Sequence, residues 1–147
     1  MEGAHGVIVR ADMLLVDVEP EAFRGVILPG GKASWTLRNT PAVLALVRDM
    51  HRGEKLVAAI CAAPIALEAA GVLAGRSITC YPAEDVREDV ASAKAVSESP
   101  VVVDGHIITG RGPGAALDFG FALGEYLGCA GRVPELKKDM CYSPHAE

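Results

Sequence analysis

The sequence has few aromatic residues and no excess of positive charge. Aromatic side chains make up 5% of the 147 residues, and the formal net charge is −5. No basic cluster with interleaved aromatics occurs, which argues against binding to nucleic acid or to an anionic membrane surface. The four cysteines show no C-x-x-C pair and no zinc-type spacing, so we expect no metal site.

Long unbroken apolar runs and a secretory signal are also lacking. Between Lys55 and Arg76 only Glu68 is charged, but Pro64 and Gly71 interrupt this stretch. It therefore predicts a buried strand followed by a core helix, not a membrane span. The N-terminus has no basic region followed by a long apolar stretch, so no signal peptide is expected. Half of the residues are hydrophobic, so a core needs no disulfides, and we expect a reducing, cytoplasmic setting.

Candidate strands and helices alternate along the chain. Short apolar runs predict strands at residues 7–9, 25–28, 56–60, 77–80, 101–103 and 106–108. Helices are expected at about 41–52, 64–71 and 114–127, and the charged stretch 83–99 is expected to form a surface helix or loop. Such alternation predicts an α/β fold, with a mostly parallel sheet covered by helices on both faces. The length is that of one domain, which we assign to residues 1–147.

Cys61 lies between the predicted strand 56–60 and a helix that Pro64 opens. A cysteine at such a turn lies near the positive end of the helix dipole, where its thiol pKa falls and a reactive thiolate forms. This arrangement is the thiol version of a nucleophile elbow. An inert buried cysteine is the alternative, and the spacing alone leaves both open.

Three strand ends carry residues suited to a reactive site. They are Gly30-Gly31, Cys61-Ala62 and the segment Gly110 to Pro113. In parallel α/β sheets, sites form outside the carboxyl ends of the strands, so we expect these segments to converge. Backbone N–H groups gathered around a thiol can stabilise an oxyanion.

The sequences of these three segments resemble those of the DJ-1/PfpI superfamily. The segments are Leu28-Pro29-Gly30-Gly31, then Ala58 to Pro64 with Cys61 inside it, then Arg111-Gly112-Pro113-Gly114. The resemblance is closest to the DJ-1 branch, with its YajL-like proteins. PfpI proteases place a histidine directly after the cysteine, where this chain has Ala62. The similarity covers about residues 6–136 and leaves 137–147 as a tail.

The resemblance implies a flavodoxin-like three-layer sandwich and a homodimer. It implies that Cys61 is the catalytic nucleophile and that the N–H groups of Gly31 and Ala62, beside Gly30, form an oxyanion hole. The residues implied to line the pocket and its dimer-facing wall are Arg111, Gly112 and Pro113. The implied activity is that of a glyoxalase III or deglycase acting without a cofactor on small α-oxoaldehydes such as methylglyoxal, or on glycated adducts.

The chain also departs from the family pattern at its beginning. Family members start with a strand, a helix and a second strand ahead of the segment aligned with residues 7–9, and a glutamate after the first strand orients the cysteine. No residue here aligns with that glutamate, so the resemblance implies an N-terminally truncated version of the fold. Asp17, Glu19 and Glu21 are the nearest upstream carboxylates, and we expect them to be surface residues. This departure favours an alternative function: a redox-sensing or chaperone-like oxidative-stress protein in which Cys61 is oxidised without turnover.

Several other residues have two interpretations each. Cys80 is either a resolving thiol for Cys61 or a buried packing residue. Tyr81, at the position of a pocket histidine in some relatives, either donates a hydrogen bond to a substrate carbonyl or packs in the structure. Arg111 either binds an anionic product or forms a structural ion pair at the dimer contact. The glycine-rich segment 110–114 resembles a phosphate loop only weakly, because its proline lacks an N–H. The histidines, all weak candidates for catalysis, are His5, His51, His106 and His145.

Overall fold

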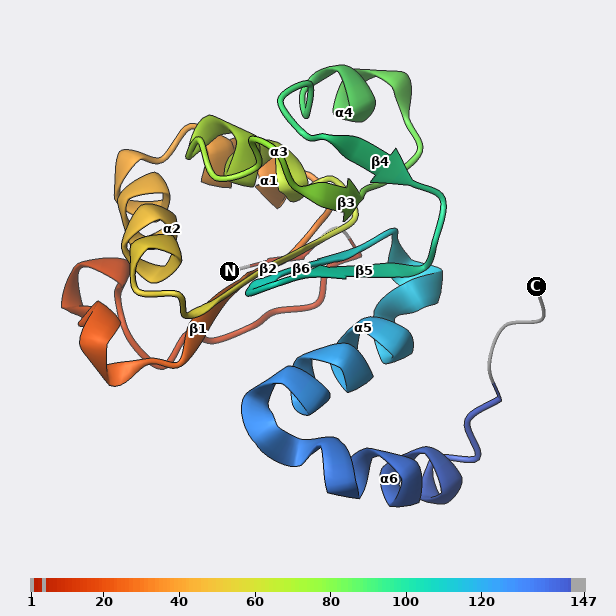
Figure 1. Cartoon of the computed structure of the whole chain (residues 1–147). Helices are drawn as coiled ribbons and strands as arrows, with labels where there is room; N and C mark the ends of the chain where they lie inside the picture. The colour runs from red at the N-terminus through yellow and green to blue at the C-terminus, as the bar shows by residue number, and fades with distance from the viewer. Residues whose placement is uncertain (1, 4, 144–147) are drawn as a thin grey trace.

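A four-stranded sheet forms the centre of the protein, as a computed structural model that describes residues 2–3 and 5–143 shows (Figure 1). Its strand order is β1-β2-β6-β5, in which the first three strands are parallel and β5 is antiparallel to β6. The strands are β1 (Gly25–Leu28), β2 (Leu56–Ile60), β5 (Val101–Asp104) and β6 (Ile107–Gly110). This mostly parallel sheet confirms the predicted fold class.

Alternate side chains of β2 enter two separate cores, one on each face of the sheet. Val57 and Ala59 belong to one apolar cluster, while Leu56 and Ala58 belong to the other. All four are almost completely buried, as expected for a central strand between two helical layers. The first face is covered by α1 (Ala33–Arg38), α2 (Pro41–Arg52) and α3 (Pro64–Ala69), and the second by α5 (Ala116–Gly124).

The structure confirms the helix starts and the hairpin turn that the sequence predicts. Helix α2 begins at Pro41 and α3 begins at Pro64, where the missing proline N–H needs no helical partner. β5 and β6 form the predicted hairpin, and Gly105 adopts a φ of +63° in its turn. An L-residue rarely adopts this conformation, so glycine is favoured there.

A smaller parallel pair, β3 (Ser77–Thr79) and β4 (Ala95–Ser97), lies beside the main sheet. A buried hydrogen bond joins the two sheets, in which the Thr79 N–H donates to Thr109 Oγ1 at 2.9 Å. The charged stretch 83–99, predicted as a surface helix or loop, contains α4 (Glu84–Glu88) and also strand β4. The prediction missed this strand because its three residues lie among polar neighbours.

The strand predicted at residues 7–9 is wrong. The segment before β1 contains two short 3-10 turns, Leu15–Asp17 and Pro20–Ala22, and an isolated bridge between Glu2 and Ile8. Within the described residues β1 pairs only with β2, and the apolar run does not occupy the other edge of β1. Ile8 is consequently 79% exposed.

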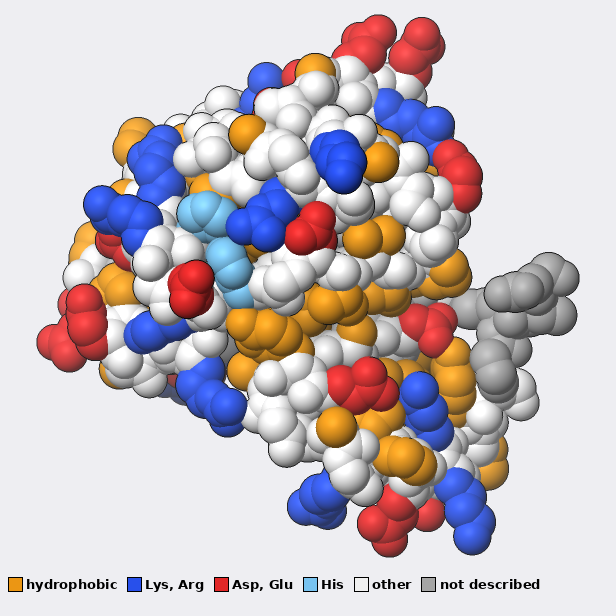
Figure 2. Space-filling model, in the orientation of Figure 1, with side chains coloured by type: hydrophobic (Ala, Val, Ile, Leu, Met, Phe, Trp, Pro, Cys, Tyr) orange, Lys and Arg blue, Asp and Glu red, His pale blue; other side chains and the backbone are white. Residues whose placement is uncertain are grey.

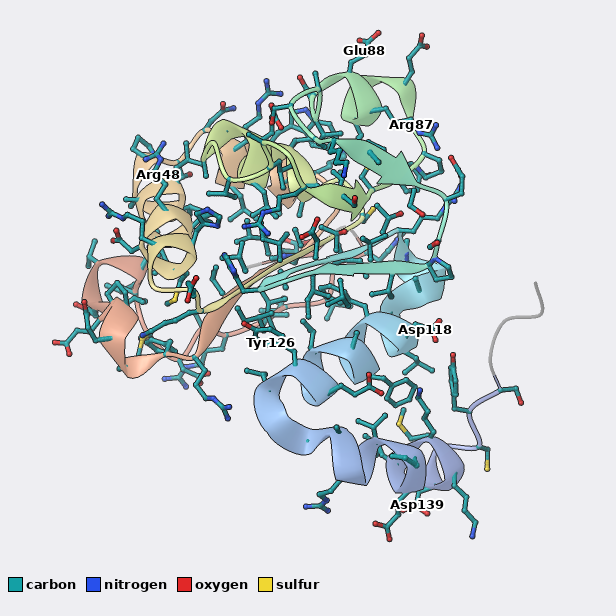
Figure 3. All side chains as sticks on the ribbon, in the orientation of Figure 1. Arg48, Arg87, Glu88, Asp118, Tyr126 and Asp139 are labelled. Carbon is teal, nitrogen blue, oxygen red and sulfur yellow. The ribbon has the colours of Figure 1, made fainter. Side chains whose placement is uncertain are left out.

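α5 lies against the second face of the sheet, and α6 (Val133–Asp139) lies farther from it (Figure 1). α5 leads through irregular turns into α6, which includes the start of the predicted tail 137–147. Asp118 within α5 and Tyr126, which follows the end of α5, are both labelled in Figure 3. The Tyr142 hydroxyl donates a hydrogen bond to Asp118 and so joins the segment after α6 to α5.

Among the residues that the structure describes, no helix has both the length and the hydrophobicity needed to cross a membrane.

Candidate functional site

The carboxyl ends of β1, β2 and β6 meet at one edge of the sheet. The pairing register places Leu28 beside Ala59, and Ile60 beside Gly110. The glycine-rich end of β1, Cys61 and the segment from Arg111 onward therefore leave the sheet side by side, as the sequence predicts. The chain after β3 reaches the same place, because the Tyr81 N–H donates to the Cys61 carbonyl oxygen at 2.9 Å.

Cys61 adopts a backbone conformation that is unusual for a residue with a side chain. Its φ is +64°, and the turn around it is closed by a hydrogen bond from the Ala63 N–H to the Ile60 carbonyl at 3.1 Å. A second hydrogen bond, from the Cys61 N–H to the Gly110 carbonyl at 2.8 Å, fixes the start of the turn. Such strain costs about 1–3 kcal/mol and persists where surrounding contacts hold it. Cys61 is only half-buried, so it is not sealed inside the core.

Gly30 packs directly against Cys61. A Cβ placed on Gly30 would lie 3.2 Å from Cys61 Sγ and 2.5 Å from Cys61 Cβ, so no larger residue fits without moving the elbow. Gly31, the next residue, has a φ of +73° and open space around it. Within the described residues neither the Gly31 N–H nor the Ala62 N–H donates a hydrogen bond. Two backbone donors near the elbow are thus available to a ligand.

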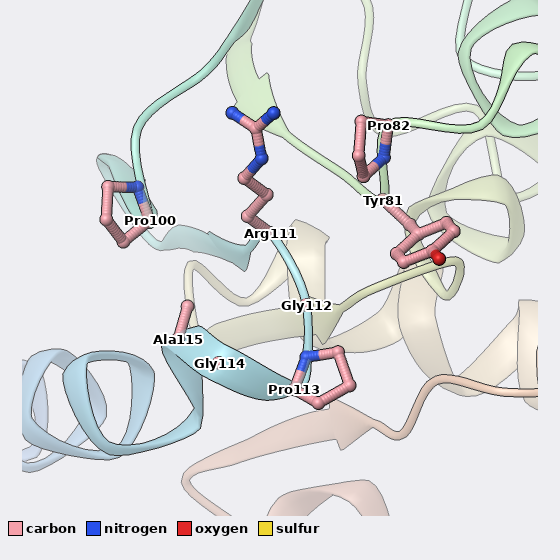
Figure 4. Close-up of a pocket in the computed structure, with 8 residues that line it drawn as sticks. All are labelled: Tyr81, Pro82, Pro100, Arg111, Gly112, Pro113, Gly114 and Ala115. Carbon is pink, nitrogen blue, oxygen red and sulfur yellow. The ribbon is translucent and has the colours of Figure 1, made fainter.

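A pocket of about 330 Å³ lies beside this edge (Figure 4). The sequence-predicted residues Arg111, Gly112 and Pro113 all line it, whereas Cys61 itself is not among the lining residues. The link between elbow and pocket is Tyr81, which lines the pocket and whose N–H binds the Cys61 carbonyl. The complete lining consists of Tyr81, Pro82, Pro100, Arg111, Gly112, Pro113, Gly114 and Ala115.

The charge of Arg111 is paired within the protein. Its guanidinium contacts both the carboxylate and the backbone carbonyl of Glu98, and Arg87 binds the same carboxylate. Hydrogen bonds from Arg87 and Arg111 hold the pKa of the Glu98 carboxyl below its ordinary value. Of the two interpretations of Arg111, the structure contains the ion pair, and the paired side chain still forms part of the pocket wall (Figure 4).

Cys80 is buried in the same apolar cluster against which Cys61 packs. Burial raises the pKa of the Cys80 thiol, and the nearby Cys61 adds to this, although Arg87 and Arg111 act in the opposite direction. A thiol with a raised pKa remains protonated at neutral pH and is a poor nucleophile. The structure therefore favours the packing interpretation of Cys80.

The upstream carboxylates do not approach Cys61. Lys55, which precedes β2, donates hydrogen bonds to the carbonyls of Pro20 and Glu21 at 2.8 and 3.2 Å. Glu21 therefore lies at the amino end of β2, while Cys61 follows its carboxyl end. Asp17 and Glu19 are exposed in the same short segment, as expected of surface residues.

Sequence reasoning missed several pocket residues. Pro82, Pro100 and Ala115 line the pocket but belong to no recognisable motif. Pro100 is placed there by its backbone, since its carbonyl accepts a hydrogen bond from the Arg111 N–H at 2.9 Å. The only available signal was position, because Pro82 follows a predicted strand and Pro100 precedes another.

Cys61 has a strained backbone and lies between the parallel strand β2 and helix α3, beside the glycine-rich end of β1. This arrangement defines an α/β protein with a nucleophile elbow. The family model described as DJ-1/PfpI family matches residues 1–126. The chain therefore belongs to the DJ-1/PfpI family, which confirms the resemblance seen in its motifs.

Individual relatives agree with this assignment. The chain is 37% identical to protein dj-1beta of Drosophila melanogaster over 138 residues, which cover 93% of this chain and 73% of the relative. It is 38% identical to a deglycase of Thermococcus kodakarensis over 113 residues, 76% of this chain and 67% of the relative. It spans only 29% and 37% of the length of two DJ-1 homologues from Arabidopsis thaliana.

Solved structures confirm the flavodoxin-like fold. The crystal structure of Drosophila melanogaster DJ-1beta superimposes with a TM-score of 0.88 at 34% identity, covering 96% of this chain and 76% of that one. A DJ-1 superfamily protein from Salmonella typhimurium gives a TM-score of 0.86 at 33% identity, covering 97% and 77%.

Proposed function

We propose that the protein is a DJ-1-like glyoxalase III or deglycase-type enzyme that uses Cys61 to convert small α-oxoaldehydes such as methylglyoxal, without a cofactor. The observation that carries this proposal is the elbow itself, in which a half-buried thiol at a φ of +64° touches Gly30. The name of the Thermococcus kodakarensis relative, a deglycase, supports the deglycase-type part of this proposal.

The first chemical step is attack of the Cys61 thiolate on the aldehyde carbon. A C–S bond forms, the carbonyl electron pair moves to oxygen, and the N–H groups of Gly31 and Ala62 stabilise the resulting oxyanion. Protonation gives a hemithioacetal. A proton then moves from the former aldehyde carbon to the neighbouring carbonyl carbon through an enediol intermediate. This transfer oxidises the former aldehyde carbon and reduces the neighbouring one. Water finally releases the 2-hydroxy acid and the thiol, so no external oxidant or reductant is needed.

The pocket beside the elbow holds the rest of the substrate. Its lining is almost entirely apolar apart from Arg111 and the Tyr81 hydroxyl, which suits a small carbonyl compound with one polar end. Gly112 and Pro113 bring the backbone close without bulky side chains. As in the sequence-based expectation, we propose that the protein is a cytoplasmic homodimer and that this pocket wall faces the partner subunit.

An assay of lactate formation from methylglyoxal tests the proposed reaction. We expect the wild-type protein to form lactate and the Cys61→Ser variant to form none above the uncatalysed rate. Cys129→Ser is the matched control, because Cys129 is an exposed cysteine far along the chain in the turn that follows α5, and it should keep full activity. Equal and negligible lactate from the wild type and the Cys61→Ser variant would refute the enzyme.

The second candidate function is an oxidative-stress role in which Cys61 is oxidised without turnover. The observation that favours it is the position of Glu21, at the opposite end of β2 from Cys61, which leaves the thiol without this acid or base. Exposure to hydrogen peroxide should then add two oxygens to Cys61 while buried Cys80 stays unmodified, as peptide mass spectrometry would show. Suppression of the aggregation of a heated client protein, before and after oxidation, tests chaperone activity.

A further inference from the structure

A small cavity lies between the carboxyl end of α2 and the loop that follows α3. Its volume is about 260 Å³, and it is lined by Arg48, His51, Arg52, Ala70, Gly71 and Val72. Pockets for drug-sized ligands measure roughly 300–1,000 Å³, so this cavity suits a small ligand or one group of a larger ligand. On the face drawn in Figure 2, histidine side chains lie at the surface among Lys and Arg side chains.

Arg48, on α2, presents unused hydrogen-bond donors to this cavity (Figure 3). Its Nε–H donates to the Ala70 carbonyl at 3.1 Å, which holds the guanidinium against the loop after α3. Within the described residues the N–H groups on its two terminal nitrogens donate to no protein acceptor. A guanidinium held in this way can bind two oxygens of one anion through parallel hydrogen bonds.

His51 supplies a second donor to the cavity. Its Nδ1 lies 2.9 Å from Nε2 of His106, so the two rings share one proton in a hydrogen bond. When His106 donates this bond, the other ring nitrogen of His51, Nε2, carries a proton that it can donate to an anion. His106 immediately precedes β6, so this cavity lies at the end of the sheet opposite to Cys61 and is separate from the elbow.

The charges that act on the two rings are mainly positive. Burial, followed by the nearby Arg76, lowers the pKa of His51. Burial, His51 and Arg76 lower the pKa of His106. Glu54 and Asp104 oppose this second shift, but neither contributes to the shift of His51, which lines the cavity. The surroundings of His51 therefore favour an anion over a cation.

Ion pairs compensate the other two arginines of this region. Arg52 is paired with Asp49, and Arg76 is paired with Asp104 at 3.1 Å. Of the three arginines, Arg48 alone lacks a carboxylate partner among the residues that the structure describes. We propose that Arg48 and His51 form a binding site for a tetrahedral dianion, such as the phosphate group of a small molecule.

The carboxyl end of α2 opposes an anion less than an open helix end does. The last carbonyls of a helix carry partial negative charge when they have no partner. Here the carbonyls of residues 49–51 accept hydrogen bonds from the N–H groups of residues 53–55. The partial charge of these carbonyls is thus compensated within the chain.

Calorimetric titration of the full chain with sulfate tests the site, against sodium chloride of equal ionic strength. Sulfate is tetrahedral and keeps two negative charges at both pH 6 and pH 8. Arg48→Gln should weaken sulfate binding at least about tenfold, because charge-assisted hydrogen bonds are lost. Arg10→Gln is the matched control, since it removes the same charge from an exposed position before β1 and should bind like the wild type. Equal affinities of the two variants would overturn the site.

The dependence of binding on pH tests the part that His51 plays. A bound dianion favours the protonated ring, so the affinity of the wild type for sulfate should rise from pH 8 to pH 6. The neutral His106 can then accept the hydrogen bond from His51 Nδ1. His51→Gln should abolish this rise, and an equal rise in the variant would overturn the role of His51.

A measurement on the unmodified sequence guards against variants that fail to fold. Sulfate should protect Arg48 from modification by 2,3-butanedione and leave Arg10 reactive, as peptide mass spectrometry would show. Absence of this protection would overturn the site. Titration with glycerol 3-phosphate distinguishes the source of the anion. Tighter binding than that of sulfate would identify an organic phosphate, equal binding would identify an inorganic anion, and failure of both to bind would refute the proposal.

Discussion

The contact between Gly30 and Cys61 leads to the sharpest prediction, which concerns the variant Gly30→Ala. The added methyl carbon would lie 2.5 Å from Cys61 Cβ and 2.9 Å from the Ile60 carbonyl oxygen. Neither atom belongs to the end of a flexible side chain, so the elbow or the end of β1 must move. Overpacking of this kind costs about 1–3 kcal/mol, and we expect a loss of about 2–3 kcal/mol because the main chain is involved. The shift also moves Sγ relative to the N–H groups of Gly31 and Ala62.

Urea denaturation and the rate of Cys61 alkylation measure the two consequences. Peptide mass spectrometry is needed to follow Cys61 separately from the exposed Cys129 and Cys141. Gly31→Ala is the matched control, because its new Cβ meets no atom within 4 Å and only its φ of +73° is unfavourable. That conformation costs an L-residue about 1–2 kcal/mol. A Gly30→Ala variant with wild-type stability and an unchanged alkylation rate would show that Gly30 does not lie against the sulfur.

Three further predictions concern stability, each measured by urea denaturation. The pKa values of His51 and His106 are lowered on folding, so the unfolded state binds more protons below about pH 6.5 and the free energy of unfolding should fall as the pH decreases from there. His106→Gln should flatten this pH dependence. An unchanged slope in the variant would contradict the pairing of the two histidines. Thr109→Val leaves the buried N–H of Thr79 without its acceptor and should cost about 1–3 kcal/mol, with no loss expected if water replaced the hydroxyl. Gly120→Ala, in α5 with no atom within 4 Å of the new methyl group, should stabilise by about 0.5–1 kcal/mol, and destabilisation would indicate an unseen contact.

The elbow and the strand ends were predictable from sequence because their signals are local. A buried run ending in Cys61, with Pro64 three residues later, leaves few conformations for the turn between them. The glycines after β1 follow an apolar strand directly, so parallel pairing brings them to the same edge. The packing of Gly30 on the sulfur was not predictable, because the two residues are distant in sequence.

Other features depend on partners that the sequence does not reveal. The apolar run at residues 7–9 has the composition of a strand, but it takes part only in the isolated bridge between Glu2 and Ile8 and does not pair with the open edge of β1. His51 and His106 each lack a motif, and only the packing of α2 against the sheet brings their rings together. β4 was missed because its three residues lie among polar neighbours, and its pairing with β3 joins segments separated by α4.

The outer side of β1 has a consequence for how the chain behaves in solution. Within the described residues this strand is hydrogen-bonded to β2 alone, and Ile27 on it is 50% exposed. An open strand with an apolar side chain is a template on which another extended segment can add as the next strand. We therefore expect self-association to rise with protein concentration and to diminish when Ile27 is replaced by lysine, which light scattering would measure.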